Sequence, residues 1–145
     1  MCGLVGYWTH GEFDYDRAQN TLRQMNQMLD HRGPDDSGYW IDANRNICMA
    51  HKRLSIIDLS KAGAQPMFSS SKRYILIFNG EIYNHDSIRS ELEKSKSINW
   101  QGHSDTETFI EAIDCWGVKK ATQASNGMFA FALWDQVSGK LTLGR

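Results

Sequence analysis

Apolar residues along the chain follow two spacings, one typical of helices and one typical of strands. Residues 15–30 are predicted to form an amphipathic helix, because apolar side chains recur there at helical spacing. These side chains are Ala18, Leu22, Met25 and Leu29. Two more helices are expected to begin after Asn84 and after Ser104, and Ser104 has the spacing of a capping box with Glu107.

Strands are predicted where apolar and aromatic residues run together. The runs cover residues 2–8, 39–42, 47–57, 74–78, 128–134 and 141–143. Residues 74–78 (YILIF) are almost continuously apolar, which is typical of a strand buried on both faces. Residues 32–38 (RGPDDSG) are predicted to be a loop, and residues 135–140 a turn.

Strands mixed with peripheral helices indicate a layered α/β or α+β domain, and 145 residues are the size of one such domain. The chain ends at Arg145, just after the second strand of the last predicted hairpin has begun. We therefore expect a C-terminally truncated domain, whose sheet has an unpaired edge near Leu141 and Leu143. Such an edge favours self-association, so the sequence leaves a homo-oligomer open.

Composition excludes several classes of function. The chain has 16 basic and 17 acidic residues and a formal net charge of -1, so no strong field attracts nucleic acid or an anionic membrane. No apolar run approaches the roughly 18 residues of a membrane-spanning helix. Three cysteines without a C-x-x-C pair argue against a disulfide scaffold and a cysteine zinc site, and we expect a cytoplasmic protein.

Cys2 is the first candidate for chemistry. Removal of Met1 would place its thiol beside its own α-amine, a group with a reference pKa of about 7.7–8.0 that can act as a base near neutral pH. The alternative is a buried cysteine that happens to occupy position two. The Met-Cys pair by itself favours this alternative.

Asn79 and Gly80 have two interpretations. Asn-Gly after an apolar run is a strong hairpin signal, and this segment alone favours a plain turn. The Asn amide and the Gly N–H can also donate two hydrogen bonds to one oxyanion.

Two charged residues also have two interpretations each. Arg53 either forms an ordinary pair at the surface or binds a carboxylate with two hydrogen bonds. Asp105 either interacts with the dipole of its helix or binds an ammonium group. Taken singly, the ordinary roles are favoured.

Other cofactor chemistry has little support. The five histidines form no H-x-x-x-H or H-E-x-x-H pair, so we expect no metal site. Neither G-x-G-x-x-G nor G-x-x-x-x-G-K-[ST] occurs, so the sequence offers no nucleotide fingerprint.

Several motifs in one order closely resemble the class II glutamine amidotransferase domain, and more narrowly its asparagine synthetase-like branch. The motifs are MCGLVGY, RGPDDSG, RLSIIDLS, FNGEIYN, SDTE and NGMFAFALWD. The likeness covers residues 1–145 as one domain and implies an N-terminal nucleophile (Ntn) hydrolase fold, a four-layer αββα sandwich of two mainly antiparallel sheets. It also implies that the family domain continues beyond Arg145.

The resemblance assigns roles by motif. Cys2 would be the nucleophile and its α-amine the general base, with Asn79 and Gly80 forming the oxyanion hole. Arg53 and the backbone of the next four residues would bind the substrate carboxylate, and Glu81 and Asp105 the ammonium group. These four backbone positions are Leu54, Ser55, Ile56 and Ile57.

The implied activity is hydrolysis of the glutamine side-chain amide, with ammonia passed to a synthetase domain. No cofactor is expected in this domain, because ATP and Mg²⁺ would belong to the synthetase domain, whose S-G-G-x-D-S motif does not occur here. The acceptor stays open between aspartate and a sugar carboxylate. Two other classes also stay open, a non-catalytic glutamine-binding module and a thiol hydrolase that pairs Cys2 with a histidine.

Overall fold

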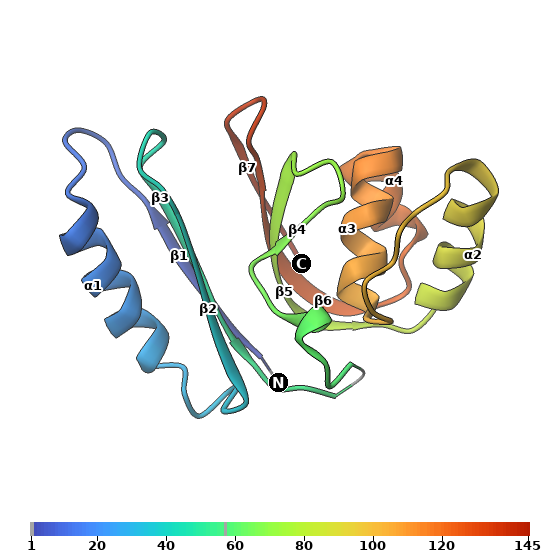
Figure 1. Ribbon diagram of the computed structural model, residues 1–145, viewed down its shortest axis with the longest axis horizontal. Helices are drawn as coiled ribbons and strands as arrows, with labels where there is room; N and C mark the ends of the chain where they lie inside the picture. Colours follow the sequence, from blue (N-terminus) through green and yellow to red (C-terminus); the bar gives the residue numbers. More distant parts are fainter. Residues whose placement is uncertain (1, 57) are drawn as a thin grey trace.

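The apolar runs of the sequence assemble into two antiparallel sheets in the computed structural model, which describes residues 2–56 and 58–145 (Figure 1). The first sheet has the order β1-β3-β2, and the second has the order β4-β5-β6-β7. The strands are β1 (Gly3–Trp8), β2 (Asp36–Asp42), β3 (Ile47–Arg53), β4 (Met67–Phe68), β5 (Tyr74–Ile82), β6 (Gly127–Asp135) and β7 (Lys140–Gly144).

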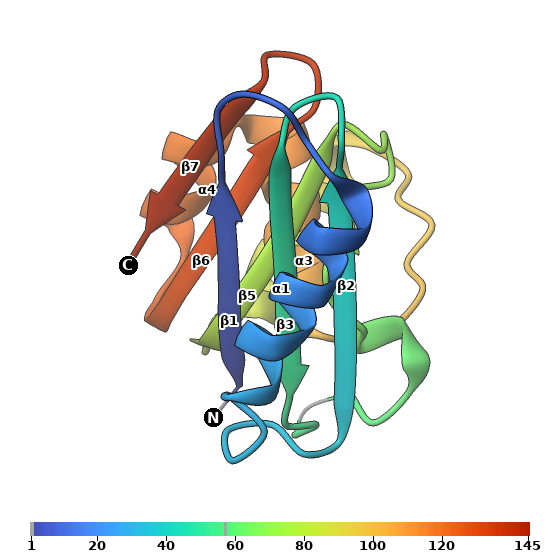
Figure 2. The ribbon, with the colours of Figure 1, turned by 90° about the vertical axis from the view of Figure 1, so that its left-hand side faces the viewer.

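Helices cover the outer face of each sheet, so that four layers follow one another as α, β, β and α (Figure 1). Helix α1 (Tyr15–Gln27) lies on the three-stranded sheet, in front of β1, β3 and β2 in Figure 2. The opposite layer holds α2 (His85–Ser95), α3 (Asp105–Trp116) and α4 (Val118–Ala124). This arrangement confirms the predicted αββα sandwich.

Three cores fill the spaces between these layers, and β5 contributes to two of them. Ile75 and Ile77 of β5 pack between the sheets with Trp134, whereas Leu76 and Phe78 face the helical layer. The alternate residues of the YILIF run therefore enter different cores, and the prediction of a strand buried on both faces is confirmed. The helical core contains an aromatic cluster of Phe78, Phe109, Phe129 and Phe131.

The helix starts follow the capping signals in part. Ser104 Oγ accepts a hydrogen bond of 3.1 Å from the Glu107 N–H, as predicted. The Glu107 carboxylate does not complete the box and binds the backbone of the preceding loop instead. Asn84 precedes α2 without capping it, because its side chain bonds with the backbone of Ala124 and Asn126.

Several predicted boundaries were wrong. Strand β3 ends at Arg53 rather than at residue 57, and β2 begins inside the predicted loop, at Asp36. The β4 strand and the α4 helix were not predicted. The predicted turn at Asn79-Gly80 is extended backbone, because β5 continues to Ile82 and pairs with β6 along its whole length.

Gly80 shows why a turn signal can occur inside this strand. Its φ is +154°, and a Cβ at this position would lie 2.3 Å from the carbonyl oxygen of Met128 on β6. Only glycine fits so close to the neighbouring strand. The Asn-Gly pair is therefore a response to the cross-strand neighbour and not to a chain reversal.

Candidate active site

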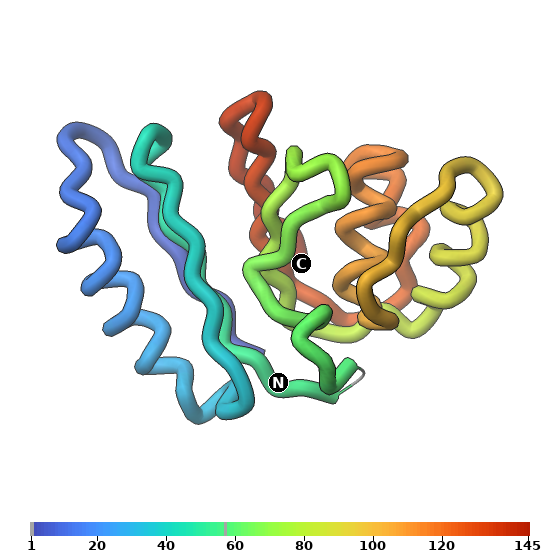
Figure 3. The backbone as a smooth tube through the Cα atoms, in the orientation of Figure 1, coloured from blue at the N-terminus to red at the C-terminus, as the bar shows by residue number. Residues whose placement is uncertain are grey.

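A cavity of about 210 Å³ lies beside the start of β1, the end of β3 and the C-terminal half of β5. In Figure 3 the segment that follows β3 runs past the N-terminal end of the chain toward the helical layer. All predicted site residues that the structure describes line this cavity. They are Cys2, Arg53, Leu54, Ser55, Ile56, Asn79, Gly80, Glu81 and Asp105, whereas Ile57 lies outside the described residues.

The half-buried Cys2 is held by the segment after β3. The Leu54 N–H donates to its Sγ at 3.3 Å, and the Leu54 carbonyl oxygen lies 3.6 Å from the same sulfur. The thiol can donate to this carbonyl oxygen and accept from this N–H, so both backbone groups of Leu54 fix the position of the sulfur. The cavity thus holds a thiol that could act as a nucleophile.

Arg32 is a contact that the sequence interpretation missed. Its Nε donates a 3.2 Å hydrogen bond to the Cys2 carbonyl oxygen and so fixes the backbone of the candidate nucleophile. Arg32 begins the RGPDDSG motif, which was noted only as a loop and as part of the family resemblance. The motif is the only feature of the sequence that singles out Arg32, and its residues do not indicate a contact with Cys2.

Arg53 is a buried cation whose charge is left for a ligand. Its guanidinium donates to the carbonyl oxygen of Ser60 at 2.8 Å and to that of Asp58. Among the described residues, no carboxylate lies within 4.0 Å of it. A guanidinium carries five N–H donors, so it can hold these two carbonyls and still bind a carboxylate in the cavity.

Asp105 is the first residue of α3 and lines the same cavity. Its carboxylate accepts hydrogen bonds from the backbone N–H groups of Ile82 at 2.9 Å and Thr106 at 2.8 Å. Burial raises the pKa of Asp105, and these hydrogen bonds oppose the rise. The Thr106 hydroxyl donates a longer hydrogen bond of 3.4 Å to the same carboxylate. A carboxylate offers about four acceptor positions, so these three donors leave one for an ammonium group.

The candidate oxyanion donors also lie at this cavity. Within the described part of the chain, the half-buried Asn79 side chain makes no hydrogen bond, so its amide is free to donate to a ligand. Gly80 follows it in extended backbone, and the exposed Glu81 stands at the cavity edge. Cys2 Sγ, a cationic side chain, amide donors and carboxylates therefore share one space.

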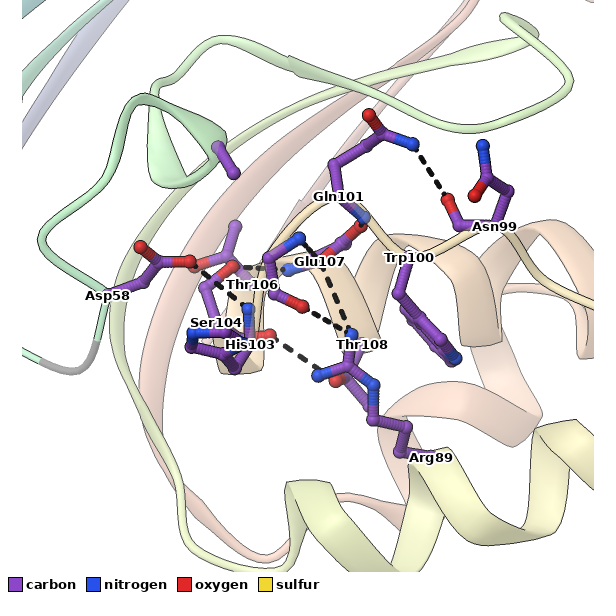
Figure 4. Close-up of polar contacts among 12 residues, drawn as sticks. Asp58, Arg89, Asn99, Trp100, Gln101, His103, Ser104, Thr106, Glu107 and Thr108 are labelled. Carbon is purple, nitrogen blue, oxygen red and sulfur yellow. Dashed lines mark hydrogen bonds and ion pairs between the residues drawn. The ribbon is translucent and has the colours of Figure 1, made fainter.

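A polar network outside the predicted set connects the two ends of the site (Figure 4). The buried Asp58 carboxylate accepts from the backbone N–H of Ser60 at 2.8 Å and from that of His103 at 3.1 Å. Hydrogen bonds from both residues outweigh the effect of burial and hold the pKa of Asp58 below its usual value. Asp58 thus joins the loop that binds Arg53 to the segment that leads into Asp105.

Arg89 and Glu107 hold the segment that leads into α3 through its residues Gln101 and Gly102 (Figure 4). Arg89 lies 3.8 Å from the centre of the Trp100 ring and donates to the Gly102 carbonyl oxygen at 2.6 Å. The Glu107 carboxylate accepts from the N–H groups of Gln101 at 2.6 Å and Gly102 at 3.0 Å. The start of α3 is therefore fixed by side chains of two helices and one loop.

Neither a metal centre nor a membrane span is found in the described part. No group of three or more His, Cys, Asp or Glu side chains there is placed to hold a metal ion. No helix there has both the length and the apolar character needed to cross a bilayer.

The family model described as the glutamine amidotransferase domain matches residues 1–145, which is the whole chain. The chain belongs to the glutamine amidotransferase domain family. This result confirms the family indicated by the motifs and places the Cys2 cavity in a known class of domain.

Curated relatives point to one branch of this family. The chain is 39% identical over 137 residues to asparagine synthetase [glutamine-hydrolyzing] 1 of Bacillus subtilis, covering 94% of this chain and 21% of that protein. It is 35% identical over 145 residues to asparagine synthetase B of Escherichia coli, covering 100% of this chain and 25% of that protein. The chain thus spans about a fifth to a quarter of the length of these relatives.

A solved structure supports the fold. The glutamine phosphoribosylpyrophosphate amidotransferase from B. subtilis matches 91% of this chain and 35% of its own chain, with a TM-score of 0.69 and 23% identity. This likeness confirms the two-sheet architecture of the amidotransferase domain and nothing about its substrate.

Proposed function

We propose that this amidotransferase domain hydrolyses the side-chain amide of glutamine and supplies the ammonia to a synthetase domain. The observation that supports it most is the single cavity, which brings Cys2, Asn79 and Gly80 together with Arg53 and Asp105. These residues come from four separate parts of the chain. Their chemistry matches an amide carbon at one end of the substrate and an amino-acid head group at the other.

The reaction follows from these groups. Once Met1 is removed, the free Cys2 α-amine accepts the thiol proton, and the thiolate attacks the amide carbon. Asn79 Nδ2 and the Gly80 N–H stabilise the oxyanion, and ammonia leaves with the proton that the amine returns. Water then hydrolyses the γ-glutamyl thioester to release glutamate and restore the thiol.

Substrate binding uses the far end of the cavity. Arg53 would bind the α-carboxylate with the backbone of Leu54, Ser55 and Ile56, while Asp105 and Glu81 would bind the α-ammonium group. Two charge-assisted contacts fix the position of the amide relative to Cys2, and positioning of this kind can supply about 7–11 kcal/mol of the barrier. No cofactor takes part in these steps.

A Cys2→Ala variant tests this proposal, with Cys48→Ala and Cys115→Ala as matched controls. Cys2→Ala should lose both glutamate release and labelling by an electrophilic glutamine analogue, and the controls should keep both. Labelling that persists in Cys2→Ala would refute the assignment. No histidine is among the described residues that line the cavity, which disfavours a Cys–His thiol hydrolase. A wild-type protein that binds glutamine without hydrolysing it would support the non-catalytic alternative.

The ammonia acceptor forms a separate part of the proposal. The names of the relatives favour aspartate over a sugar carboxylate. Residues 1–145 alone should release ammonia without consuming ATP, because they contain no Gly-rich phosphate-binding loop. Incubation with glutamine, ATP, Mg²⁺ and aspartate tests this, and an amidated product would contradict it. The three free cysteines also fit a reducing compartment, and we propose the cytoplasm.

A further inference from the structure

Both backbone polar groups of Phe78, the residue before Asn79, are held by buried side chains. The Phe78 N–H donates to Gln65 Oε1 at 2.6 Å, and the Phe78 carbonyl oxygen lies 2.9 Å from His51 Nε2. His51 is 0% exposed and belongs to β3 of the first sheet. Gln65 lies between the short helix Lys61–Gly63 and β4. A side chain of the first sheet, His51, thus binds the backbone of β5 in the second sheet.

These two side chains replace a missing neighbouring strand. Strand β4 pairs with β5 only at Ile75 and Leu76, so it stops short of Phe78. Phe78 is 2% exposed, so its backbone has little access to water. An unpaired buried N–H or C=O destabilises the folded state, which explains why polar side chains occupy this place. Because β4 does not extend along this part of β5, the following residues Asn79 and Gly80 can line the cavity.

The protonation state of His51 follows from its contact. A carbonyl oxygen only accepts hydrogen bonds, so Nε2 must carry the proton. Burial lowers the pKa of His51 to about 4, and the ring is neutral at ordinary assay pH. Its single N–H is therefore committed to Phe78. In the described part of the chain, its Nδ1 is buried without a hydrogen-bond partner.

We infer that His51 and Gln65 are positioning residues, which hold the two peptide groups of Phe78 and thereby aim Asn79 and Gly80 at the oxyanion. His51 does not line the cavity and acts only through Phe78. This inference rests on the proposed function, in which these two donors stabilise the transition state. A misplacement of about 1 Å can cost on the order of 10²-fold in rate, so a rotated peptide would slow the chemistry.

The test compares His51→Leu with His51→Gln. Leucine fills the site but cannot donate, whereas the glutamine Nε2 reaches close to the position of the imidazole Nε2. We expect His51→Leu to lower kcat for glutamine by about 10- to 100-fold with KM nearly unchanged, and His51→Gln to recover most of the loss. Reaction of Cys2 with a small neutral alkylating agent should stay at the wild-type rate. An unchanged kcat in His51→Leu, or a rise in KM alone, would overturn the inference.

Two further arms keep the test decisive. If His51→Leu does not fold, His51→Asn serves instead, because its shorter amide cannot reach Phe78. Equal kcat values for the Asn and Gln variants would then overturn the inference.

If the wild-type protein releases no glutamate, the proposed function fails, and NMR then tests the positioning alone. The amide signals of Asn79 and Gly80 should shift in the non-donating variant and return toward wild type in His51→Gln. Signals that stay unchanged would overturn the inference.

Discussion

Gly63→Ala displaces the Arg53 guanidinium without removing its charge. A Cβ on Gly63 would lie 2.2 Å from one terminal nitrogen of Arg53 and 2.8 Å from its Cζ. That nitrogen must move by about 1.2 Å to reach an ordinary contact of 3.4 Å. The backbone of Gly63 does not have a positive φ, so alanine introduces no strain of its own.

The size of the effect follows from the contacts that are lost. A hydrogen bond to a charged group is worth about 1.5–3 kcal/mol, which corresponds to roughly 10- to 150-fold in an equilibrium constant. We therefore expect KM for glutamine to rise by about 10-fold or more. The kcat value should change less, because Cys2 and Asn79 keep their places. The unfolding free energy should fall as well, because the displaced terminal nitrogen donates to the Asp58 carbonyl oxygen.

A double-mutant cycle with Arg53→Ala shows whether the guanidinium is responsible. In the Arg53→Ala background the methyl group meets no guanidinium, so Gly63→Ala should have no further effect on KM. Steady-state kinetics of the four proteins, with urea unfolding as the stability control, give the coupling. Equal effects in both backgrounds would mean that the loop, and not Arg53, is disturbed. No effect in either would refute the role of Arg53 in binding.

Other predictions concern the oxyanion, the ammonium group and acid stability. Asn79→Ala should lower kcat by on the order of 10²–10³ with little change in KM, and a rise in KM alone would make Asn79 a substrate contact instead. Asp105→Asn should raise KM while Cys2 still reacts with a neutral alkylating agent, and parallel loss of both would indicate misfolding. Arg73 forms two hydrogen bonds of 3.0 and 2.7 Å with Asp135 and holds the pKa of that carboxyl well below its usual range. Its stabilising effect should be present above the unfolded pKa of about 3.9 and lost as the pH falls toward the folded value. Asp135→Asn should therefore be less stable than wild type at pH 7, with a gap that shrinks below about pH 4, and a gap independent of pH in urea unfolding would contradict this.

Patterns of neighbouring residues were sufficient to predict the helices and strands that are determined by nearby residues in the sequence. The helical spacing of Ala18 and Leu22 predicted α1, and the buried YILIF run predicted the centre of β5, because each pattern records which face is packed. The family motifs also placed nine described residues that the fold brings to one cavity. Motif order can do this because the residues of a site are selected together even when they lie far apart in the chain.

The sequence by itself therefore determined the family, the type of most elements and the set of residues that share the site. Only the tertiary structure decided that Asn79-Gly80 is extended, because the pairing of β5 with β6 overrides a local turn preference. It alone revealed the contacts of Arg32 with Cys2 and of His51 with Phe78, whose partners lie 30 and 27 residues apart in the chain. The His51 contact depends on how the two sheets stack, and the Arg32 contact on how a loop folds back to the start of β1. No periodicity along the chain records either arrangement.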